Sequence, residues 1–230
     1  MTTYLGSGDV STHRTDYTPE WLGKLADDVT LEAAVINGVA VGPEAVRAIL
    51  GFARTLYDYQ EFNVDMLLKH ADVPKGSFYH HFGSKDQFAQ RVLEGYHDFQ
   101  MAQLARWSAR TDLAVPERLR LYYLDMVERF VRSAFQRACL AGKFSSELAA
   151  SSSTIRSQLS ANFAQWRDGI ADLLETGQRD GSVRTDCQAV DLADSVLALM
   201  QGAFVVAFSV RDEDSVRRLA DSLVGLVAVP

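Results

Sequence analysis

One fifteen-residue stretch, PKGSFYHHFGSKDQF at residues 74–88, concentrates the residue types that carry chemistry in this chain. Lys75, Gly76 and Ser77 form a small, positively charged start to a short helix. Tyr79 and His80 add a phenol hydroxyl and a ring nitrogen. Ammonium, hydroxyl and imidazole groups of this kind donate hydrogen bonds to phosphate oxygens. The stretch therefore indicates a surface that contacts a polyanion.

A metal site or an active site explains the same stretch less well. His80 and His81 are adjacent, so on a helix their side chains point about 100° apart, and no cysteine or glutamate completes a ligand-spaced set. The chain also lacks the G-x-S-x-G, H-E-x-x-H and G-x-x-x-x-G-K-[ST] motifs of common catalytic sites. The sequence predicts no metal, no cofactor and no enzymatic activity.

Composition narrows the class of protein further. The 230 residues are 47% hydrophobic, and the net charge of −7 disfavours a protein that coats nucleic acid non-specifically. The longest apolar run, Val196–Phe208, is interrupted by Gln201 and is too short for a membrane span. The start of the chain lacks the pattern of a signal peptide, and the chain holds 2 cysteines. We therefore predict a soluble cytoplasmic protein with no membrane partner.

The elements that must position the phosphate-binding stretch are helices. Start signals and apolar periodicity predict helices at about 19–28, 44–59, 64–70, 75–81 and 84–110, then from Pro116, around Gly142, and at 154–179, 187–211 and 213–228. Ser84 and Gln87 form a capping box before the longest of the early helices. The stretch VTLEAAVINGVAV stays unassigned. We expect no region able to form a sheet, and hence an all-α fold.

The spacing of the early helices is that of a helix-turn-helix DNA reader, in which the second short helix enters the major groove. Phe78 and Phe82, four residues apart, are expected to face inward and hold that helix to the core. The run VDMLLKHADVPKGSFYHHFGSKDQF resembles the tetracycline-repressor (TetR) family of bacterial regulators over residues 44–95. The resemblance implies a homodimer that contacts double-stranded operator DNA through Lys75, Gly76, Ser77, Tyr79, His80 and Lys85.

The remainder of the chain is expected to bind an effector and to dimerise. The whole chain then divides into an acidic N-terminal extension (1–43), a helix-turn-helix domain (44–90) and an effector-binding and dimerisation domain (91–230). Each aromatic residue on the successive C-terminal helices is compatible with an ordinary core, but together they exceed the needs of a tight bundle and favour an apolar pocket. Its predicted lining is Trp107, Tyr122, Met126, Phe130, Cys139, Phe163, Trp166 and Phe204. The apolar faces of the last two helices predict a dimer interface of Leu192, Val196, Leu199, Ala203, Val216, Leu219, Leu223 and Val227.

A second resemblance concerns the effector. The run RACLAGKFSSELAASSSTIRSQL, followed by a long helix with Trp166, is similar to TetR relatives that sense electrophiles, acrylate-type compounds and related reactive metabolites. In some of these relatives a cysteine at the position of Cys139 takes part in sensing. A buried cysteine that acts as a small hydrophobic side chain is the other interpretation of Cys139.

Two departures from the family pattern leave a second function open. Asp72 stands where the family usually has the glycine of the turn, and an acidic extension replaces the usual basic arm. Phosphate neutralisation supplies much of DNA affinity, so both changes weaken it. The sequence predicts a repressor that a small apolar or electrophilic effector releases from its operator. The alternative is a TetR-like protein that has lost operator binding and pairs with another regulator.

Overall fold

The computed structural model describes residues 34–36, 39–41, 75–135 and 137–229 of the chain. The helices expected at about 19–28, 44–59 and 64–70 lie outside these residues, as do the turn at 71–73 and most of the extension 1–43. The described part is almost wholly helical, which confirms the predicted all-α class.

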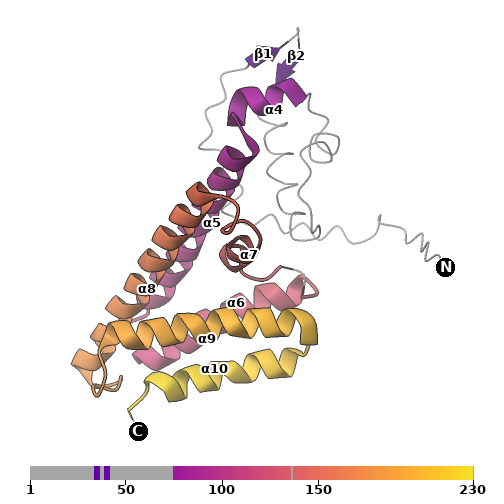
Figure 1. Cartoon of the computed structure of the whole chain (residues 1–230). Coiled ribbons are helices and arrows are strands. Elements are labelled where there is room, and N and C mark those ends of the chain that lie inside the picture. The colour runs from indigo at the N-terminus through magenta and orange to yellow at the C-terminus, as the bar shows by residue number, and fades with distance from the viewer. Residues whose placement is uncertain (1–33, 37–38, 42–74, 136, 230) are drawn as a thin grey trace, which may run out of the picture.

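Seven helices follow one another from residue 75 onward (Figure 1). They are α4 (Lys75–Phe82), α5 (Lys85–Ser108), α6 (Val115–Arg132), α7 (Leu140–Glu147), α8 (Ser153–Asp180), α9 (Ala189–Val210) and α10 (Glu213–Val227). Their ends follow sequence signals. Ser84 caps α5 and accepts a 3.1 Å hydrogen bond from the backbone N–H of Gln87, and Pro116 lies in the first turn of α6. The predicted helix boundaries are thus confirmed for the described residues.

The expectation that no region forms a sheet is wrong at one place. β1 (Ala34–Ile36) and β2 (Val39–Val41) pair as antiparallel strands, with Ile36 opposite Val39 and Ala34 opposite Val41. Valine and isoleucine favour strands, and the intervening residues Asn37-Gly38 are the pair most typical of two-residue hairpins. The helical patterns on either side obscured this signal. β1 lies beside α4 (Figure 1).

The long helices α5 and α8 lie side by side and run in the same direction (Figure 1). His97 meets Gln165 at 2.7 Å, and the amide of Gln158 donates to the backbone oxygen of Gln90 at 3.0 Å. Both pairs are separated by 68 residues, so one constant offset describes the parallel register. Gly169 permits the close approach: a Cβ there would stand 2.9 Å from a methyl carbon of Leu104.

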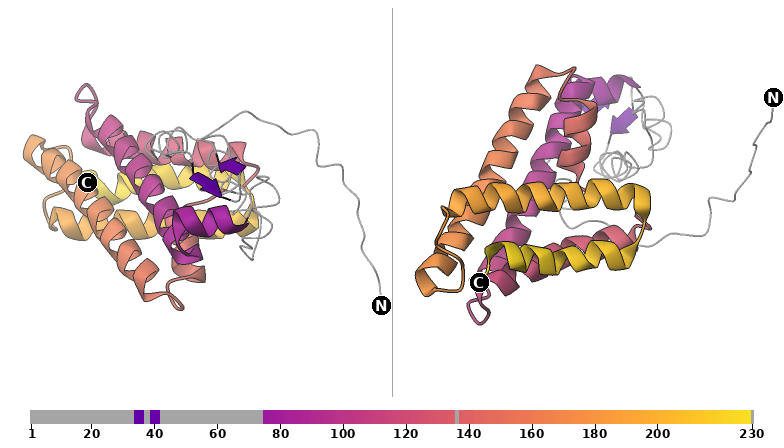
Figure 2. Two further views of the ribbon diagram at one scale, coloured as in Figure 1. Left: turned by 90° about the horizontal axis from the view of Figure 1, so that it is seen from above. Right: turned by 60° about the horizontal axis from the view of Figure 1, so that its bottom comes forward.

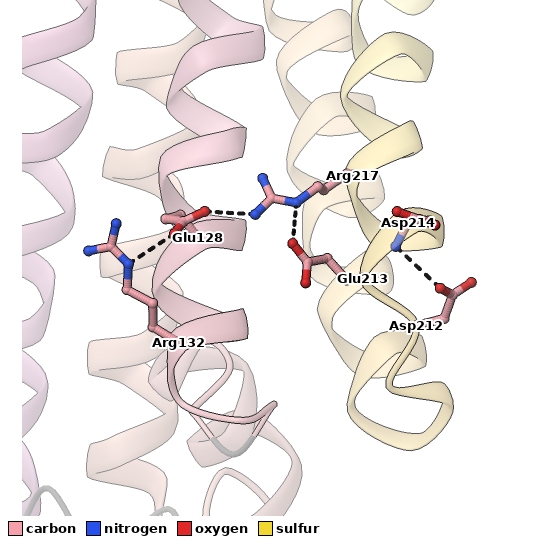
Figure 3. Close-up of polar contacts among 6 residues, drawn as sticks. All are labelled: Glu128, Arg132, Asp212, Glu213, Asp214 and Arg217. Atoms are coloured by element: carbon pink, nitrogen blue, oxygen red, sulfur yellow. Dashed lines mark hydrogen bonds and ion pairs between the residues drawn. The ribbon is translucent and has the colours of Figure 1, made fainter. Parts of the chain in front are cut away.

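α6, α9 and α10 run across one end of this pair (Figures 1 and 2). α6 and α10 are antiparallel neighbours, and the buried hydroxyl of Tyr123 donates a 2.8 Å hydrogen bond to the backbone oxygen of Val216. At the surface of the same interface Arg217 binds Glu128 and Glu213, each at 2.7 Å, and Arg132 binds Glu128 at 2.9 Å (Figure 3). Packing and polar contacts therefore fix α10 onto α6.

α9 is the one helix of the described part that is long and apolar enough to cross a bilayer, by length and composition alone. Core helices of water-soluble proteins meet the same criterion. Here α9 packs along α8 and α10 (Figure 2), and Val196 and Met200 are fully buried. The contacts within the chain account for its apolar inner side.

The structure corrects the predicted dimer interface. Most of the predicted residues are buried inside a single chain: Leu192, Val196, Ala203, Val216, Leu223 and Val227 are each at most 5% exposed. Leu199 and Leu219 are half-buried and pack against the same core. An amphipathic helix turns its most apolar side to its own core first, and the sequence pattern alone did not separate that use from dimerisation. The large apolar side chains that remain exposed on α9 are Val190, Val205, Val206, Phe208 and Val210.

Candidate DNA-binding surface and effector site

Aromatic packing holds α4 in place. Phe78 is fully buried, and its ring lies 5.1 Å from that of Phe82 and 5.4 Å from that of Phe88 on α5. The rings of Phe82 and Phe88 are 4.9 Å apart in an edge-to-face arrangement, a geometry that adds to the stability from burial alone. The prediction that Phe78 and Phe82 face inward is confirmed.

The opposite side of α4 faces solvent. Lys75, Gly76, Tyr79 and His80 are exposed, and the ring of Tyr79 is 41% exposed. β1 contacts α4 without covering these residues. The structure describes the backbone of Ser77 in the same helix. Five of the predicted DNA-contact positions therefore lie on one short helix that its own phenylalanines anchor.

Lys85 begins α5, directly after the turn that ends α4. Gly83 makes this turn with a φ of +68°, a left-handed conformation that suits glycine. Its N–H donates to the backbone oxygen of Tyr79 at 2.9 Å. Since Ser84 caps the following helix, the exposed Lys85 stands at a helix N-terminus, where backbone N–H groups favour an anion. Two adjacent helix ends thus present groups suited to phosphate.

The predicted effector residues gather between α6, α8 and α9, with one exception. Phe130 packs edge-to-face on Phe204 with ring centroids 5.4 Å apart, and Phe163 stacks on Trp166 at 6.4 Å. Tyr122, Met126 and Cys139 are buried in the same core. Trp107 is the exception: it is half-buried near the end of α5, where Arg106 lies over its ring and its N–H reaches Asp125 at 3.5 Å.

Tyr122 is the most strongly perturbed member of this group. Its side chain is fully buried, and burial raises the pKa of the phenol well above its usual value. The indole N–H of Trp166 and the positive charge of Arg129 lower that pKa in part, so both groups lie near the hydroxyl. The indole N–H of Trp166 is directed at the Tyr122 hydroxyl, but neither atom has a partner at normal hydrogen-bond geometry among the described residues.

Three polar residues of this core were not predicted from the sequence, because polar residues of an amphipathic helix usually face solvent. They are Gln100 on α5, Arg129 on α6 and Gln201 on α9, and each has a buried nitrogen without a hydrogen-bond partner in the described part of the chain. A signal for Gln201 was present, since it interrupts an otherwise apolar run. Together with Tyr122 and Trp166 these residues form what we call the donor cluster: Gln100, Tyr122, Arg129, Trp166 and Gln201.

Other kinds of site find no support here. Among residues 75–135 and 137–229 and the two short strands, no group of three or more His, Cys, Asp or Glu side chains is placed to hold a metal ion. Cys139 is buried at the residue preceding α7. It lies close to Gly142, against which the amide oxygen of Gln201 also packs.

Comparison with known proteins identifies the class of both halves. Residues 55–92 match the family described as bacterial regulatory proteins, tetR family. Residues 115–223 match the family described as tetracyclin repressor-like, C-terminal domain. The two matches cover the helix-turn-helix region and the helices that carry the donor cluster beyond α5.

Individual relatives agree with this. The chain is 37% identical to the HTH-type transcriptional repressor DhaR of Mycobacterium sp. (strain GP1) over 59% of its own length and 66% of that protein. It is 32% identical to the transcriptional regulator AcuR of Cereibacter sphaeroides over 65% of its length and 68% of that protein. The crystal structure of regulatory protein TetR from Rhodobacter sphaeroides aligns with a TM-score of 0.72 at 28% identity, over 79% of this chain and 97% of that one. The chain thus spans about two thirds of the curated relatives it matches.

Proposed function

Because this chain belongs to the tetR family of DNA-binding transcriptional regulators, we propose that it is a homodimeric repressor released from its operator by a small effector. The observation that carries the proposal is the construction of α4. Three phenylalanines fix its inner side while Lys75, Tyr79 and His80 face solvent. A helix that enters the major groove needs this combination of rigid support and exposed donors. We place the protein in the cytoplasm and assign it no catalytic activity and no cofactor.

The DNA contacts we propose are Lys75, Gly76, Ser77, Tyr79, His80 and Lys85. Lys75 and Lys85 neutralise phosphate charge at the starts of α4 and α5. The Tyr79 hydroxyl and the His80 ring donate hydrogen bonds to backbone oxygens. Gly76 lets the helix approach the backbone of the duplex closely. The helix-turn-helix domain at 44–90 supplies these residues.

Dimerisation uses, in this proposal, the outward side of α9 and α10 instead of the inner side that the sequence suggested. Val205, Val206 and Val210 are 60–68% exposed. Gly202 of α9 and Gly225 of α10 have no atom within 4 Å of the position of a Cβ, so a second backbone has room to come close. A twofold axis through this face sets the two α4 helices about one DNA turn apart.

Effector binding among α5, α6, α8 and α9 shifts the dimer toward a spacing of the α4 helices that no longer fits the operator. α5 is the physical link, because it begins at Lys85 beside α4 and carries Gln100 into the donor cluster. Its parallel contact with α8 makes the two helices move together. A displacement at the effector site therefore reaches α4 through one continuous helix.

Titration of the protein against fragments of its own promoter region at about 50 mM and about 200 mM salt tests operator binding. We expect specific binding that weakens steeply with salt, and a loss of affinity on Lys75→Ala. Lys143→Ala, which removes a lysine of α7 far from α4 along the chain, is the matched control and leaves affinity unchanged. The absence of binding at low salt, with and without residues 1–43, contradicts the repressor function.

The partner-protein alternative keeps one supporting observation. β1 belongs to the acidic extension and lies beside α4, so part of residues 1–43 is next to the proposed DNA-binding helix. If this extension opposes DNA binding, deleting residues 1–43 raises affinity. If the protein acts by pairing, no DNA fragment binds either form, and the chain forms a heterodimer with a second regulator.

A further inference from the structure

The donor cluster is the feature of this core that protein packing does not explain. Tyr122, Gln100 and Trp166 are at most 3% exposed, and each has a polar hydrogen-bonding atom without a partner among the described residues. Leaving a buried donor unsatisfied destabilises a fold, because the donor has lost its water without gaining a protein partner. Native proteins contain few such groups. A bound group that carries acceptors would satisfy the five such atoms of the donor cluster.

The members of the donor cluster are neighbours. Trp166 and Arg129 both act on the pKa of Tyr122, and so does Cys139. Cys139 in turn lies beside Gly142, where the point at which a Cβ would stand is 2.8 Å from the amide oxygen of Gln201. The other end of that amide, the nitrogen, is the atom without a partner.

Gln100 joins the cluster from α5. The offset of 68 residues between α5 and α8 pairs His97 with Gln165. Gly169, one turn further along α8, meets Met101 and Leu104. Gln100 lies between these two levels on α5, and Trp166 lies between them on α8. The cluster thus draws on α5, α6, α8 and α9, which surround the core of the domain.

The unpartnered atoms of the cluster are all able to donate hydrogen bonds. Four of its five unpartnered atoms are nitrogens that only donate, and the fifth is a hydroxyl that can donate. The unpartnered acceptor Gln158 Oε1 stands two turns away on α8, where its amide binds α5. A group that satisfies the cluster must carry acceptors and no donors. A carbonyl oxygen accepts about two hydrogen bonds, whereas a carboxylate accepts about four. Five donors exceed the capacity of a single carbonyl and lie closer to that of a carboxylate.

Charge agrees with this choice. Arg129 bonds Asp125 through Nη1 at 2.7 Å and leaves Nη2 unpartnered in the described structure. Asp125 is already shared, because Arg106 also reaches the same carboxylate oxygen at 3.2 Å. Two guanidinium groups thus face one carboxylate, and the surplus is positive. A bound anion restores the balance.

We infer that the effector is a small carboxylate whose head group is bound by Gln100, Tyr122, Arg129, Trp166 and Gln201. Its short apolar tail packs toward Phe130 and Phe204. This inference rests on the proposed effector-released function and names the effector class. It replaces the apolar or electrophilic effector that the sequence predicted. Here Cys139 is a packing neighbour of the site and not a nucleophile.

Isothermal titration calorimetry of the full-length protein at pH 7 tests the inference without DNA. The probes are butanoate, butanamide, butanal and 1-butanol. We expect butanoate to bind about tenfold or more tightly than the other three, since hydrogen bonds to a charged group are the stronger ones. Equal or tighter binding of butanamide or 1-butanol overturns the inference, as does the absence of butanoate binding. If butanal binds most tightly and Cys139→Ala abolishes that binding, the effector is an electrophile. That result also overturns the carboxylate inference.

Variants that each remove one donor locate the site. Tyr122→Phe and Trp166→Phe each remove one donor, and each is expected to weaken butanoate binding about tenfold or more. Tyr123→Phe is the control, because its neighbouring hydroxyl bonds Val216 instead. Gln201→Met gives an independent variant with little change in volume. Unchanged binding in the three donor variants overturns the inference. Promoter binding without ligand is measured in parallel. If the protein binds its promoter but the donor variants do not change butanoate binding, the ligand inference has failed and the proposed repressor function has not.

Discussion

The two sides of α6 differ in how completely their polar groups are satisfied. Tyr122 and Tyr123 are consecutive, both are fully buried, and burial raises the pKa of both phenols. The Tyr123 hydroxyl donates to Val216 of α10, and salt bridges around Glu128 close the same interface (Figure 3). The Tyr122 hydroxyl lies near Trp166 and Arg129, each of which also has an unpartnered donor. One side of the helix thus serves stability, whereas the other side is the one that we propose binds a ligand.

The largest loss of stability is expected when a buried side chain of α10 is truncated. Leu223 is fully buried, so Leu223→Ala removes apolar contacts and leaves a cavity that costs about 2–5 kcal/mol of unfolding free energy. Urea unfolding monitored by circular dichroism at fixed protein concentration measures it. Ser222→Ala, at the exposed neighbouring position, changes stability by less than about 0.5 kcal/mol. Similar values for both variants would mean that α10 does not stabilise the domain.

The second effect separates the adjacent tyrosines. Tyr123→Phe removes the hydrogen bond from the Tyr123 hydroxyl to the backbone oxygen of Val216, and we expect a loss of about 0.5–1.5 kcal/mol. Tyr122→Phe removes a hydroxyl that has no partner in the described structure, and stability stays the same or rises. Urea midpoints of the two variants give the comparison. Equal losses would show that the Tyr122 hydroxyl is satisfied after all.

A smaller gain is expected at the loop between α6 and α7, on the ligand side. Ala134 has a φ of +53° and is exposed. Glycine adopts this left-handed conformation without the steric cost that alanine meets there. Ala134→Gly should raise the unfolding free energy by about 0.5–1 kcal/mol, read from the thermal midpoint. A lower midpoint would place this loop in an unstrained conformation.

The smallest effect concerns pH at the α6–α10 surface. Hydrogen bonds from Arg217 and then Arg132 hold the pKa of Glu128 below its usual value. A carboxyl with a lowered pKa stabilises the fold above its unfolded pKa of about 4.3, and this contribution is lost as the pH falls through the folded value. Because the pair is partly exposed, Arg217→Gln costs only a few tenths of a kcal/mol at pH 7.

The pH dependence of that cost checks its origin. Urea unfolding of Arg217→Gln and the wild type should differ at pH 7 and converge near pH 3. Arg218→Gln, which removes a more exposed arginine 3.9 Å from Asp212, is the control and changes stability less. A difference between Arg217→Gln and wild type that persists at low pH would assign the role of Arg217 to packing.

Local signals in the sequence were sufficient for the helices from residue 75 onward and for the buried and exposed sides of α4. Capping at Ser84 and the spacing of Phe78 and Phe82 depend on residues a few positions apart, and such patterns are visible in one chain. Whether the apolar faces of α9 and α10 pack inside one chain or between two chains depends on the tertiary arrangement of the helices. Val196 and Leu223 were therefore misassigned to a dimer interface. The hairpin at residues 34–41 was missed although Asn37-Gly38 signalled a turn.

The sequence indicated only part of the proposed effector site, for a related reason. Aromatic residues such as Tyr122 and Trp166 stand out in a sequence, and both belong to the site that we propose. Glutamine in a helix usually faces solvent, so the sequence did not predict that the side-chain nitrogens of Gln100 and Gln201 are buried. The lack of a hydrogen-bond partner is a property of three-dimensional packing, and no spacing rule reports it.

The most direct test of the two-sided account measures stability and ligand response in the same pair of variants. Urea unfolding of wild type, Tyr122→Phe and Tyr123→Phe is recorded with and without butanoate. We predict that Tyr123→Phe is less stable yet retains the stabilisation by butanoate seen in the wild type. Tyr122→Phe keeps its stability and loses most of the response. The reverse pattern, or an equal response in both variants, would contradict the assignment of the two sides of α6.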